Sequence, residues 1–222
     1  MDFAVKRGET VGIIGGTGSG KSSLVNMIPR FYDATAGEVL IGGRDVKSFE
    51  IPELRERIGI VPQKAVLFKG SIRDNMRWGK DDATDDEILA AAKTAQAADV
   101  IESKGGLDFE IEQGGKNLSG GQRQRFTIAR ALVRKPEILI LDDSASALDF
   151  ATDAALRKSI REMDTNPTVF IVSQRTSSIQ HADKIIVLDD GKIAGIGKHD
   201  ELLNNCPVYS EIYNSQFKKE AV

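Results

Sequence analysis

Short apolar runs alternate along the chain with longer amphipathic stretches. The apolar runs are rich in β-branched residues and predict buried strands, which cover residues 9–14, 58–63, 138–143, 168–172 and 184–188. The stretches between them carry helix start and stop signals and predict helices over residues 23–28, 51–57, 84–102, 119–134, 150–163 and 198–217. Strands that alternate with helices predict an α/β fold.

The middle of the chain departs from this alternation. Residues 70–106 carry no strand pattern and read as mostly helical, which suggests a helical subdomain inserted in the α/β core. Thr84 and Glu87 form a capping box that opens the helix over residues 84–102. Trp78 lies just upstream, and we expect this lone aromatic side chain to pack against a helix rather than act in catalysis.

A glycine-rich stretch follows the first predicted strand and precedes the first helix. Residues 15–22, Gly-Gly-Thr-Gly-Ser-Gly-Lys-Ser, fit the pattern G-x-x-x-x-G-K-[ST] at every fixed position. Backbone N–H groups of such a loop and the dipole of the helix that follows attract phosphate oxygens. Lys21 would reach the terminal phosphates and the Ser22 hydroxyl would bind Mg²⁺. The alternative, a linker or tight turn, fits less well between a strand and a helix.

Polar residues end two further predicted strands. Asp142 and Asp143 close the apolar run over residues 138–141, where Asp142 would hold Mg²⁺ through water and Asp143 would orient an attacking water. In the alternative, these acids cap the next helix. Gln63 ends the strand predicted over residues 58–63; it is either an ordinary loop residue or a ligand-binding residue at the carboxyl end of a strand.

A second glycine-rich motif, Leu-Ser-Gly-Gly-Gln at residues 118–122, opens the helix over residues 119–134. Ser119 and Gln122 fit a capping box, so this helix presents another N-terminus suited to an anion. The helix also carries a basic set, which consists of Arg123, Arg125, Arg130 and Arg134. We expect this set to form a solvated face, with contact to nucleic acid as the minor alternative.

Composition and charge exclude several classes of protein. The formal net charge is −3, so no global basic field favours nucleic acid or an anionic membrane surface. Cys206 is the single cysteine and cannot form an intrachain disulfide, which fits a reducing compartment. The longest apolar run, residues 88–92, is far shorter than the roughly 20 residues that span a bilayer. No secretory leader precedes the first strand, so we expect a chain that is cytosolic, or was cut so, with no transmembrane segment.

The order of these motifs resembles the nucleotide-binding domain of ABC transporters. Many NTPases contain a phosphate loop, but Leu-Ser-Gly-Gly-Gln upstream of a strand ending in Asp is close to diagnostic of this family. The resemblance covers nearly all of residues 3–217 and implies a P-loop NTPase core with a mostly parallel sheet, an N-terminal antiparallel β portion and an inserted helical subdomain at about residues 70–135. It also implies that residues 1–222 are one ABC ATPase domain that is truncated at its N-terminus.

The resemblance implies ATP and Mg²⁺ as cofactors and assigns roles to individual residues. Those expected to bind ATP are Gly15, Gly16, Thr17, Gly18, Ser19, Gly20, Lys21, Ser22, Ser23 and Gln63. Ser22, Gln63 and Asp142 would hold Mg²⁺, and Lys21, Asp143 and Gln174 would act in catalysis. The segment that contacts ATP on a second, head-to-tail domain would be Leu118, Ser119, Gly120, Gly121 and Gln122. Ser146, Ala147, Leu148 and Asp149 would contact that domain directly.

The resemblance also implies partners and a location. The Gln63 region would receive the membrane domains of a transporter, and residues 67–75 with the segment around Glu110 look like the exporter branch. The chain would then lie at the cytoplasmic face of the cell membrane. No nucleic acid partner is expected.

The chain departs from the family pattern at three places, and two of these departures suggest slow turnover. Asp143 stands where the family usually has a glutamate that orients water, and Gln174 stands where it usually has a histidine. The aromatic residue that stacks on adenine would lie upstream of residue 1. Loss at both positions resembles the degenerate half of heterodimeric bacterial multidrug exporters, whose non-identical partner supplies the intact Glu and His.

Three functions therefore compete. The first is a weakly hydrolysing ATPase domain that dimerises around ATP to power export. The second is a soluble ABC-type ATPase that acts on nucleic acid or ribosomes, which long coiled-coil heptads or a basic linker would favour; neither is present. The third is an ATP-gated clamp that binds and dimerises without hydrolysis.

Overall fold

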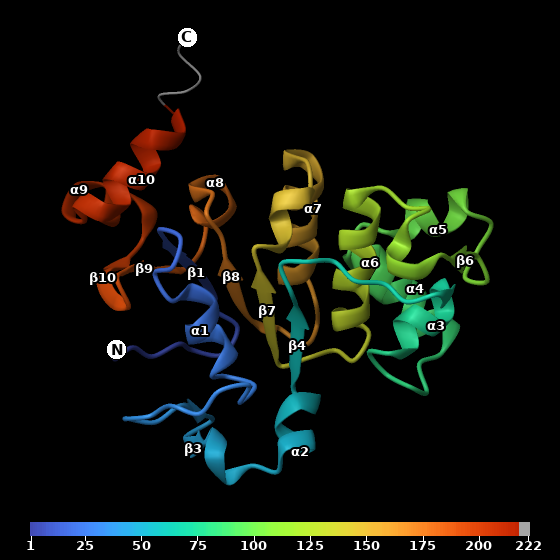
Figure 1. Cartoon of the computed structure of the whole chain (residues 1–222), viewed down its shortest axis with the longest axis horizontal. Coiled ribbons are helices and arrows are strands. Elements are labelled where there is room, and N and C mark those ends of the chain that lie inside the picture. The colour runs from blue at the N-terminus through green and yellow to red at the C-terminus, as the bar shows by residue number, and fades with distance from the viewer. Residues whose placement is uncertain (218–222) are drawn as a thin grey trace. The chain divides into compact units, whose positions relative to one another are not determined.

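The computed structural model describes residues 1–217, which divide into two compact units. The first unit joins Met1–Ile58 to the chain from Thr168 onward, and the second is Gly59–Pro167. Figure 1 shows the helices and strands of both units along the chain. The fold is mixed α/β with a mostly parallel central sheet, as predicted, and it also contains separate antiparallel strand pairs.

The first unit is built on a buried parallel strand, β1 (Thr10–Gly15). It pairs in parallel with β8 (Thr168–Val172) on one side and with β9 (Lys184–Asp189) on the other. All six residues of β1 are buried, which explains the continuous apolar run in the sequence. An antiparallel neighbour of β9, β10 (Lys192–Gly197), ends this part of the sheet.

Helices and one short strand pair surround these strands in the first unit. They are α1 (Lys21–Asn26), β2 (Leu40–Ile41), β3 (Arg44–Asp45), η1 (Val46–Ser48), α2 (Ile51–Glu56), α8 (Thr176–Ile179), α9 (His199–Asn205) and α10 (Pro207–Phe217). The antiparallel pair β2–β3 is the N-terminal antiparallel portion that the resemblance implies. The predicted helix over residues 198–217 is two helices, because the chain becomes extended at Cys206.

The second unit is mainly helical. Its elements are β4 (Ile58–Val61), β5 (Gly70–Ser71), α3 (Ile72–Arg77), α4 (Asp85–Thr94), α5 (Ala98–Ser103), β6 (Glu110–Ile111), η2 (Gln113–Gly115), α6 (Gly120–Leu132), β7 (Ile138–Asp142), η3 (Ser144–Ala147) and α7 (Phe150–Arg161). In Figure 1 the helices α3 to α6 form the green part of the ribbon. Strands β4 and β7 are neighbours in the sheet.

Three local predictions for the second unit are wrong. The helix expected over residues 84–102 is split into α4 and α5, because Gln96 adopts a left-handed conformation with φ 57°. Residues 70–106 do contain a strand, since β5 pairs with β6. The Trp78 side chain does not pack into a helix interface: it is 65% exposed, and its ring lies 4.9 Å from the ring of Phe68.

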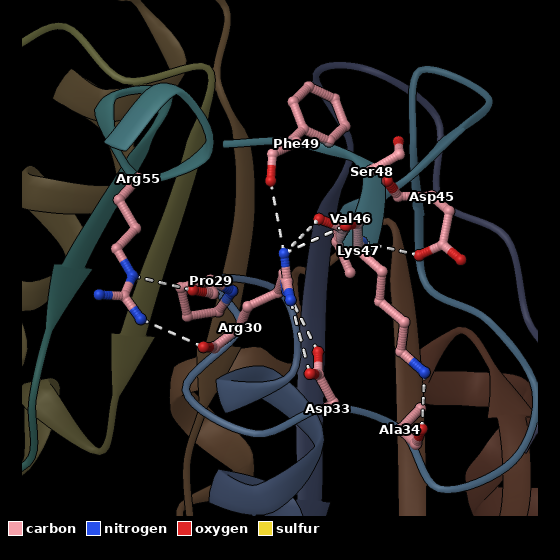
Figure 2. A network of polar contacts seen from close by, with 10 residues as sticks. All are labelled: Pro29, Arg30, Asp33, Ala34, Asp45, Val46, Lys47, Ser48, Phe49 and Arg55. Atoms are coloured by element: carbon pink, nitrogen blue, oxygen red, sulfur yellow. Dashed lines mark hydrogen bonds and ion pairs between the residues drawn. The ribbon is translucent and has the colours of Figure 1, made fainter. Parts of the chain in front are cut away.

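Two arginines of the first unit link the segment after α1 to the short helix η1 and to helix α2 (Figure 2). Arg30 donates through Nη1 to the carbonyl oxygens of Val46, Lys47 and Phe49, at 3.4, 3.3 and 3.4 Å. Its Nε donates to Asp33 Oδ1 at 3.1 Å. Figure 2 also shows Arg55, whose guanidinium donates to the carbonyl oxygens of Pro29 and Arg30 at 3.1 Å each.

We predict that Arg30→Met destabilises the chain by about 2 kcal/mol, because it leaves three backbone carbonyls without their charged donor. Methionine keeps most of the apolar stem, so the lost packing is small. Asp33→Ala serves as the control, because it removes only an ion pair with an exposed carboxylate, which contributes little to stability. Urea unfolding at pH 7 measures both values. Equal losses for the two variants would show that the carbonyl bonds carry no stability.

Candidate functional site

The glycine-rich loop leaves β1 at a point where only glycine fits. A Cβ built on Gly15 would lie 2.1 Å from the carbonyl oxygen of Leu188 and 2.6 Å from Ser19 Oγ. Farther along, Gly18 and Gly20 adopt φ angles of 81° and 93°, in the region that L side chains rarely occupy. The loop conformation therefore depends on Gly15 and Gly20, which the motif specifies, and also on Gly18, which it does not.

Lys21, the first residue of α1, turns its side chain back onto this loop. Its Nζ donates to the carbonyl oxygens of Gly15 and Gly16, both at 2.8 Å, and lies 3.5 Å from Ser19 Oγ. The first turn of α1 contains no acidic residue. An ammonium group already held among oxygen atoms, next to a helix start with no negative charge, is a donor set that fits a phosphate group.

The rest of the predicted nucleotide-binding stretch is open to a ligand. Gly16, Thr17 and Gly18 are exposed, and so are Ser22 and Ser23. A Cβ at Gly16 or Gly18 would meet nothing within 4 Å, so the loop surface there is uncovered. Ser19 differs from these residues because it is buried, and it packs against the base of the loop.

Gln174 belongs to the same unit and follows β8. Its side chain is exposed, whereas Ser173 and Thr176 on either side of it are buried. The backbone of this segment is hydrogen-bonded to β1, because Ser173 N donates to the carbonyl oxygen of Ile13 at 3.1 Å.

In the second unit, the structure brings two predicted site residues together. Gln63 follows β4 and Asp143 follows the neighbouring strand β7, and Gln63 Nε2 donates to Asp143 Oδ2 at 3.2 Å. Asp142 and Asp143 are both half-buried. Asp143 has a φ of 47°, a left-handed conformation in which aspartate is enriched among residues with a side chain. The backbone turns at Asp143 and directs its carboxylate to the Gln63 amide.

The start of α6 carries the capping box that the sequence predicts. Ser119 Oγ accepts a hydrogen bond from Gln122 N at 3.2 Å, and Gln122 Oε1 accepts one from Ser119 N at 3.0 Å. Leu118 is buried and fixes the entry of the chain, while Ser119 and Gly120 stay exposed. This helix N-terminus is therefore formed and accessible.

The segment over residues 146–149 lies beside the start of α6. A Cβ on Gly121 would lie 3.3 Å from the carbonyl oxygen of Ala147, and Leu148 is buried. Asp149 caps α7: its Oδ1 accepts a hydrogen bond from Thr152 N at 2.9 Å, and the bonds to Thr152 lower the pKa of this carboxyl group. Ser146 Oγ donates to the carbonyl oxygen of Asp143 at 2.8 Å.

The basic set of α6 is not a solvated face, so that prediction is wrong. Each of its four arginines is half-buried, and each guanidinium donates to a backbone carbonyl of the second unit. The carbonyls belong, in the order of the arginines, to Leu118, Gln96, Val66 and Gly79. Arginine stems can cover apolar surface while their charged ends satisfy carbonyl groups at loops and helix ends. Periodicity could not reveal this, because it indicates which face of a helix is polar but not what covers that face.

Residues 1–217 contain no helix that is long and apolar enough to cross a membrane. Within that described part, no three His, Cys, Asp or Glu side chains come together in a way that could hold a metal ion.

Comparison with known proteins agrees with the motifs. A family model described as ABC transporter matches residues 1–146. The protein YfiB of Bacillus subtilis, named an uncharacterized ABC transporter ATP-binding protein, is 45% identical over 221 residues, which cover 99% of this chain and 38% of YfiB. A Staphylococcus aureus protein provisionally named a multidrug export ATP-binding/permease protein is 42% identical over 217 residues, covering 97% of this chain and 38% of that protein.

A solved structure of a bacterial Atm1-family ABC exporter with ATP bound is similar to this chain with a TM-score of 0.89 and 39% identity. The similarity covers 97% of this chain and 38% of the exporter chain. The chain therefore spans about 38% of the length of the proteins it matches. The matched residues include the phosphate loop, Gln63, residues 118–122 and both aspartates. From this match and these motifs, the chain belongs to the ABC transporter family.

Proposed function

We propose that this chain is the ATP-binding, weakly hydrolysing domain of an ABC exporter, and that it dimerises around ATP with a second ABC domain. The observation that carries the proposal is the loop over residues 15–22, where glycine-dependent geometry places the Lys21 ammonium among oxygen atoms at the start of a helix. The Atm1-family exporter that resembles the chain was solved with ATP bound, which supports this reading.

The residues of the loop would hold the phosphates of ATP, and Lys21 would supply the cation for the β- and γ-phosphates. Ser22, Gln63 and Asp142 would hold Mg²⁺. This donor set fits Mg²⁺, which proteins commonly bind through one or two carboxylates together with phosphate oxygens and water. When bound, the ion would neutralise charge that develops on the phosphates.

Asp143 and Gln174 would slow hydrolysis without weakening binding. Asp143 is shorter than glutamate by one methylene group, roughly 1.5 Å, and its carboxylate is held by the Gln63 amide. A misplacement of about 1 Å can cost on the order of 10²-fold in rate. Gln174 can hydrogen-bond a γ-phosphate but stays neutral, so it cannot add positive charge as histidine can.

The segment over residues 118–122 would contact ATP bound to the second domain. Its helix, α6, is 13 residues long and its capped N-terminus is exposed at Ser119 and Gly120, which suits a terminal phosphate. Residues 146–149 lie beside it and would contact the second domain. Because Asp143 and Gln174 replace Glu and His, we propose a non-identical partner that carries both catalytic residues.

Exposed apolar side chains near Gln63 support contact with membrane domains. Val66 and Phe68 are each 39% exposed and Trp78 is 65% exposed, and the rings of Phe68 and Trp78 are in contact. Single exposed apolar residues are common, but a cluster of them often marks a protein interface. The domain would then lie at the cytoplasmic face of the membrane, with the export machinery bound here.

A soluble ABC-type ATPase that acts on nucleic acid or ribosomes is the weaker alternative. The arginines of α6, which offered the local basic surface for it, bond to backbone carbonyls instead. The Staphylococcus aureus relative is named for multidrug export. An ATP-gated clamp without hydrolysis differs from our proposal only in turnover, which is tested by measuring ATP hydrolysis in variants of Asp143 and Gln174.

We predict that Lys21→Ala weakens Mg-ATP binding at least about 100-fold, because the loop loses its one side-chain cation for the phosphates. Lys158→Ala is the control, since it removes the same charge from an exposed position on α7. Isothermal titration calorimetry of both variants gives the affinities. An affinity of Lys21→Ala within a few-fold of the control would remove Lys21 from the site.

We also predict that Asp143→Glu combined with Gln174→His raises ATP hydrolysis more than the two single changes do together. Both side chains would act on one transition state, and residues that act as a unit are strongly non-additive. Hydrolysis is measured together with a second ABC domain whose own catalytic glutamate has been replaced by glutamine, so that only this chain's site contributes.

The Asp143→Glu change needs a folding control, because glutamate at a φ of 47° carries a backbone cost of about 1–2 kcal/mol. Thermal unfolding of each variant shows whether the fold survives. A folded double variant that stays as slow as the parent would place the block elsewhere and would favour the clamp.

A further inference from the structure

Gln216, near the end of α10, joins that helix to the segment that follows β8. Its Nε2 donates to the carbonyl oxygen of Gln174 at 2.7 Å. Its Oε1 accepts hydrogen bonds from Thr176 N and Thr176 Oγ1, both at 3.0 Å. A single carboxamide thus donates one hydrogen bond to Gln174, which lies 42 positions earlier in the chain. It also accepts two hydrogen bonds from Thr176, which lies 40 positions earlier.

The Thr176 contact replaces a local helix cap. Thr176 is the first residue of α8, and Arg175 at the N-cap makes no side-chain capping bond. The first N–H groups of a helix lack intrahelical acceptors, and Thr176 is fully buried, so its N–H needs a partner from elsewhere. Gln216 provides it from another helix of the same unit.

The segment is also anchored at its other end. Ser173 N donates to the carbonyl oxygen of Ile13 in β1 at 3.1 Å, and Ser173 Oγ accepts a hydrogen bond from Arg175 N at 2.9 Å. Gly12 in the same strand has no room for a Cβ, which would lie 2.7 Å from Ile179 Cβ of α8. The backbone on both sides of Gln174 is therefore fixed, while the Gln174 side chain remains exposed.

We propose that Gln216 is a positioning residue for Gln174: its carboxamide fixes the backbone from which Gln174 reaches the γ-phosphate. This inference rests on the proposed function for the role of Gln174, but the hydrogen bonds themselves do not. Gln216 touches no part of the reaction and acts only through the segment over residues 174–176. A shift of that segment by about 1 Å is enough to cost on the order of 10²-fold in rate.

The first measurement is amide hydrogen exchange at Thr176 in the full chain without nucleotide. Gln216→Met removes both the donor and the acceptor at similar side-chain length, and we expect Thr176 N–H to exchange about tenfold faster. Asn214→Ala is the matched control, because Asn214 is exposed on the same helix. We expect it to leave Thr176 exchange unchanged. Equal exchange in Gln216→Met and the parent would overturn the anchor.

The second measurement separates the two functions of the carboxamide. Gln216→Glu keeps an acceptor for Thr176 but replaces the donor to Gln174 with a second oxygen atom. We expect exchange at Thr176 to stay near the parental rate, while kcat for ATP falls about tenfold or more with KM within about twofold. The assay is the one with a second ABC domain whose catalytic glutamate has been disabled. A parental kcat in Gln216→Glu would show that the bond to Gln174 positions nothing.

Failure of this inference can be told apart from failure of the proposed function. If Lys21→Ala hydrolyses ATP as the parent does, the proposed site is wrong, whatever Gln216 does. If Lys21→Ala is inactive and both Gln216 variants keep the parental kcat, the site stands and the positioning role is overturned. Loss of kcat in both Gln216 variants, with the Asn214 control unaffected, supports the positioning role.

Discussion

The close approach of β1 to β9 is the constraint on which the phosphate loop depends. No side chain fits at Gly15, because the carbonyl oxygen of Leu188 occupies the space that a Cβ would need. The chain must therefore leave β1 as glycine, turn through two more glycines with positive φ, and enter α1 at Lys21. This path brings the Lys21 ammonium back onto the oxygen atoms of the loop. A cation held in this way among backbone groups is arranged in advance for an anion, which explains why we place the phosphates here.

Cationic side chains serve two purposes in this chain, and the surroundings of each side chain separate them. Arg30 and Arg55 in the first unit, and the arginines of α6 in the second, donate mainly to backbone carbonyls at loops and helix ends. These contacts stabilise irregular backbone, because an arginine fork can satisfy several acceptors that lack a regular partner. The loop over residues 15–22 differs from them, since its neighbourhood is exposed and glycine-rich. We therefore attribute ligand binding to the lysine and structural support to the arginines.

The sequence predicted those parts of the fold that follow from local periodicity and capping. The buried strand before the loop, the capping boxes at Thr84 and Ser119, and the strand that ends in Asp142 are all present. Prediction from the sequence failed where the local structure depends on distant residues or on a single backbone angle. Gln96 breaks a helix through its φ angle, and the arginines of α6 find carbonyls that periodicity cannot indicate.

The candidate site shows the same division between local and distant information. Motif spacing identified the loop, Gln63 and Asp143, and it did not predict the hydrogen bond that joins Gln63 to Asp143. That bond depends on β4 and β7 being neighbours in the sheet, which is a property of topology. The sequence pattern does not indicate a role for Gln216, because a glutamine near the end of a helix looks like any other polar residue. Its contacts with Gln174 and Thr176 appear only when α10 is placed beside the segment after β8.

We propose that this chain holds ATP tightly but hydrolyses it slowly because of its own residues. The most direct measurement is a single-turnover experiment with γ-labelled ATP and Mg²⁺. The second ABC domain in this experiment lacks its phosphate-loop lysine, so that label is retained only on this chain. We expect bound nucleotide to be recovered mainly as ATP after a time in which a site with Glu and His converts nearly all of it to ADP. Rapid conversion of the label to phosphate on this chain would show that Asp143 and Gln174 do not slow hydrolysis.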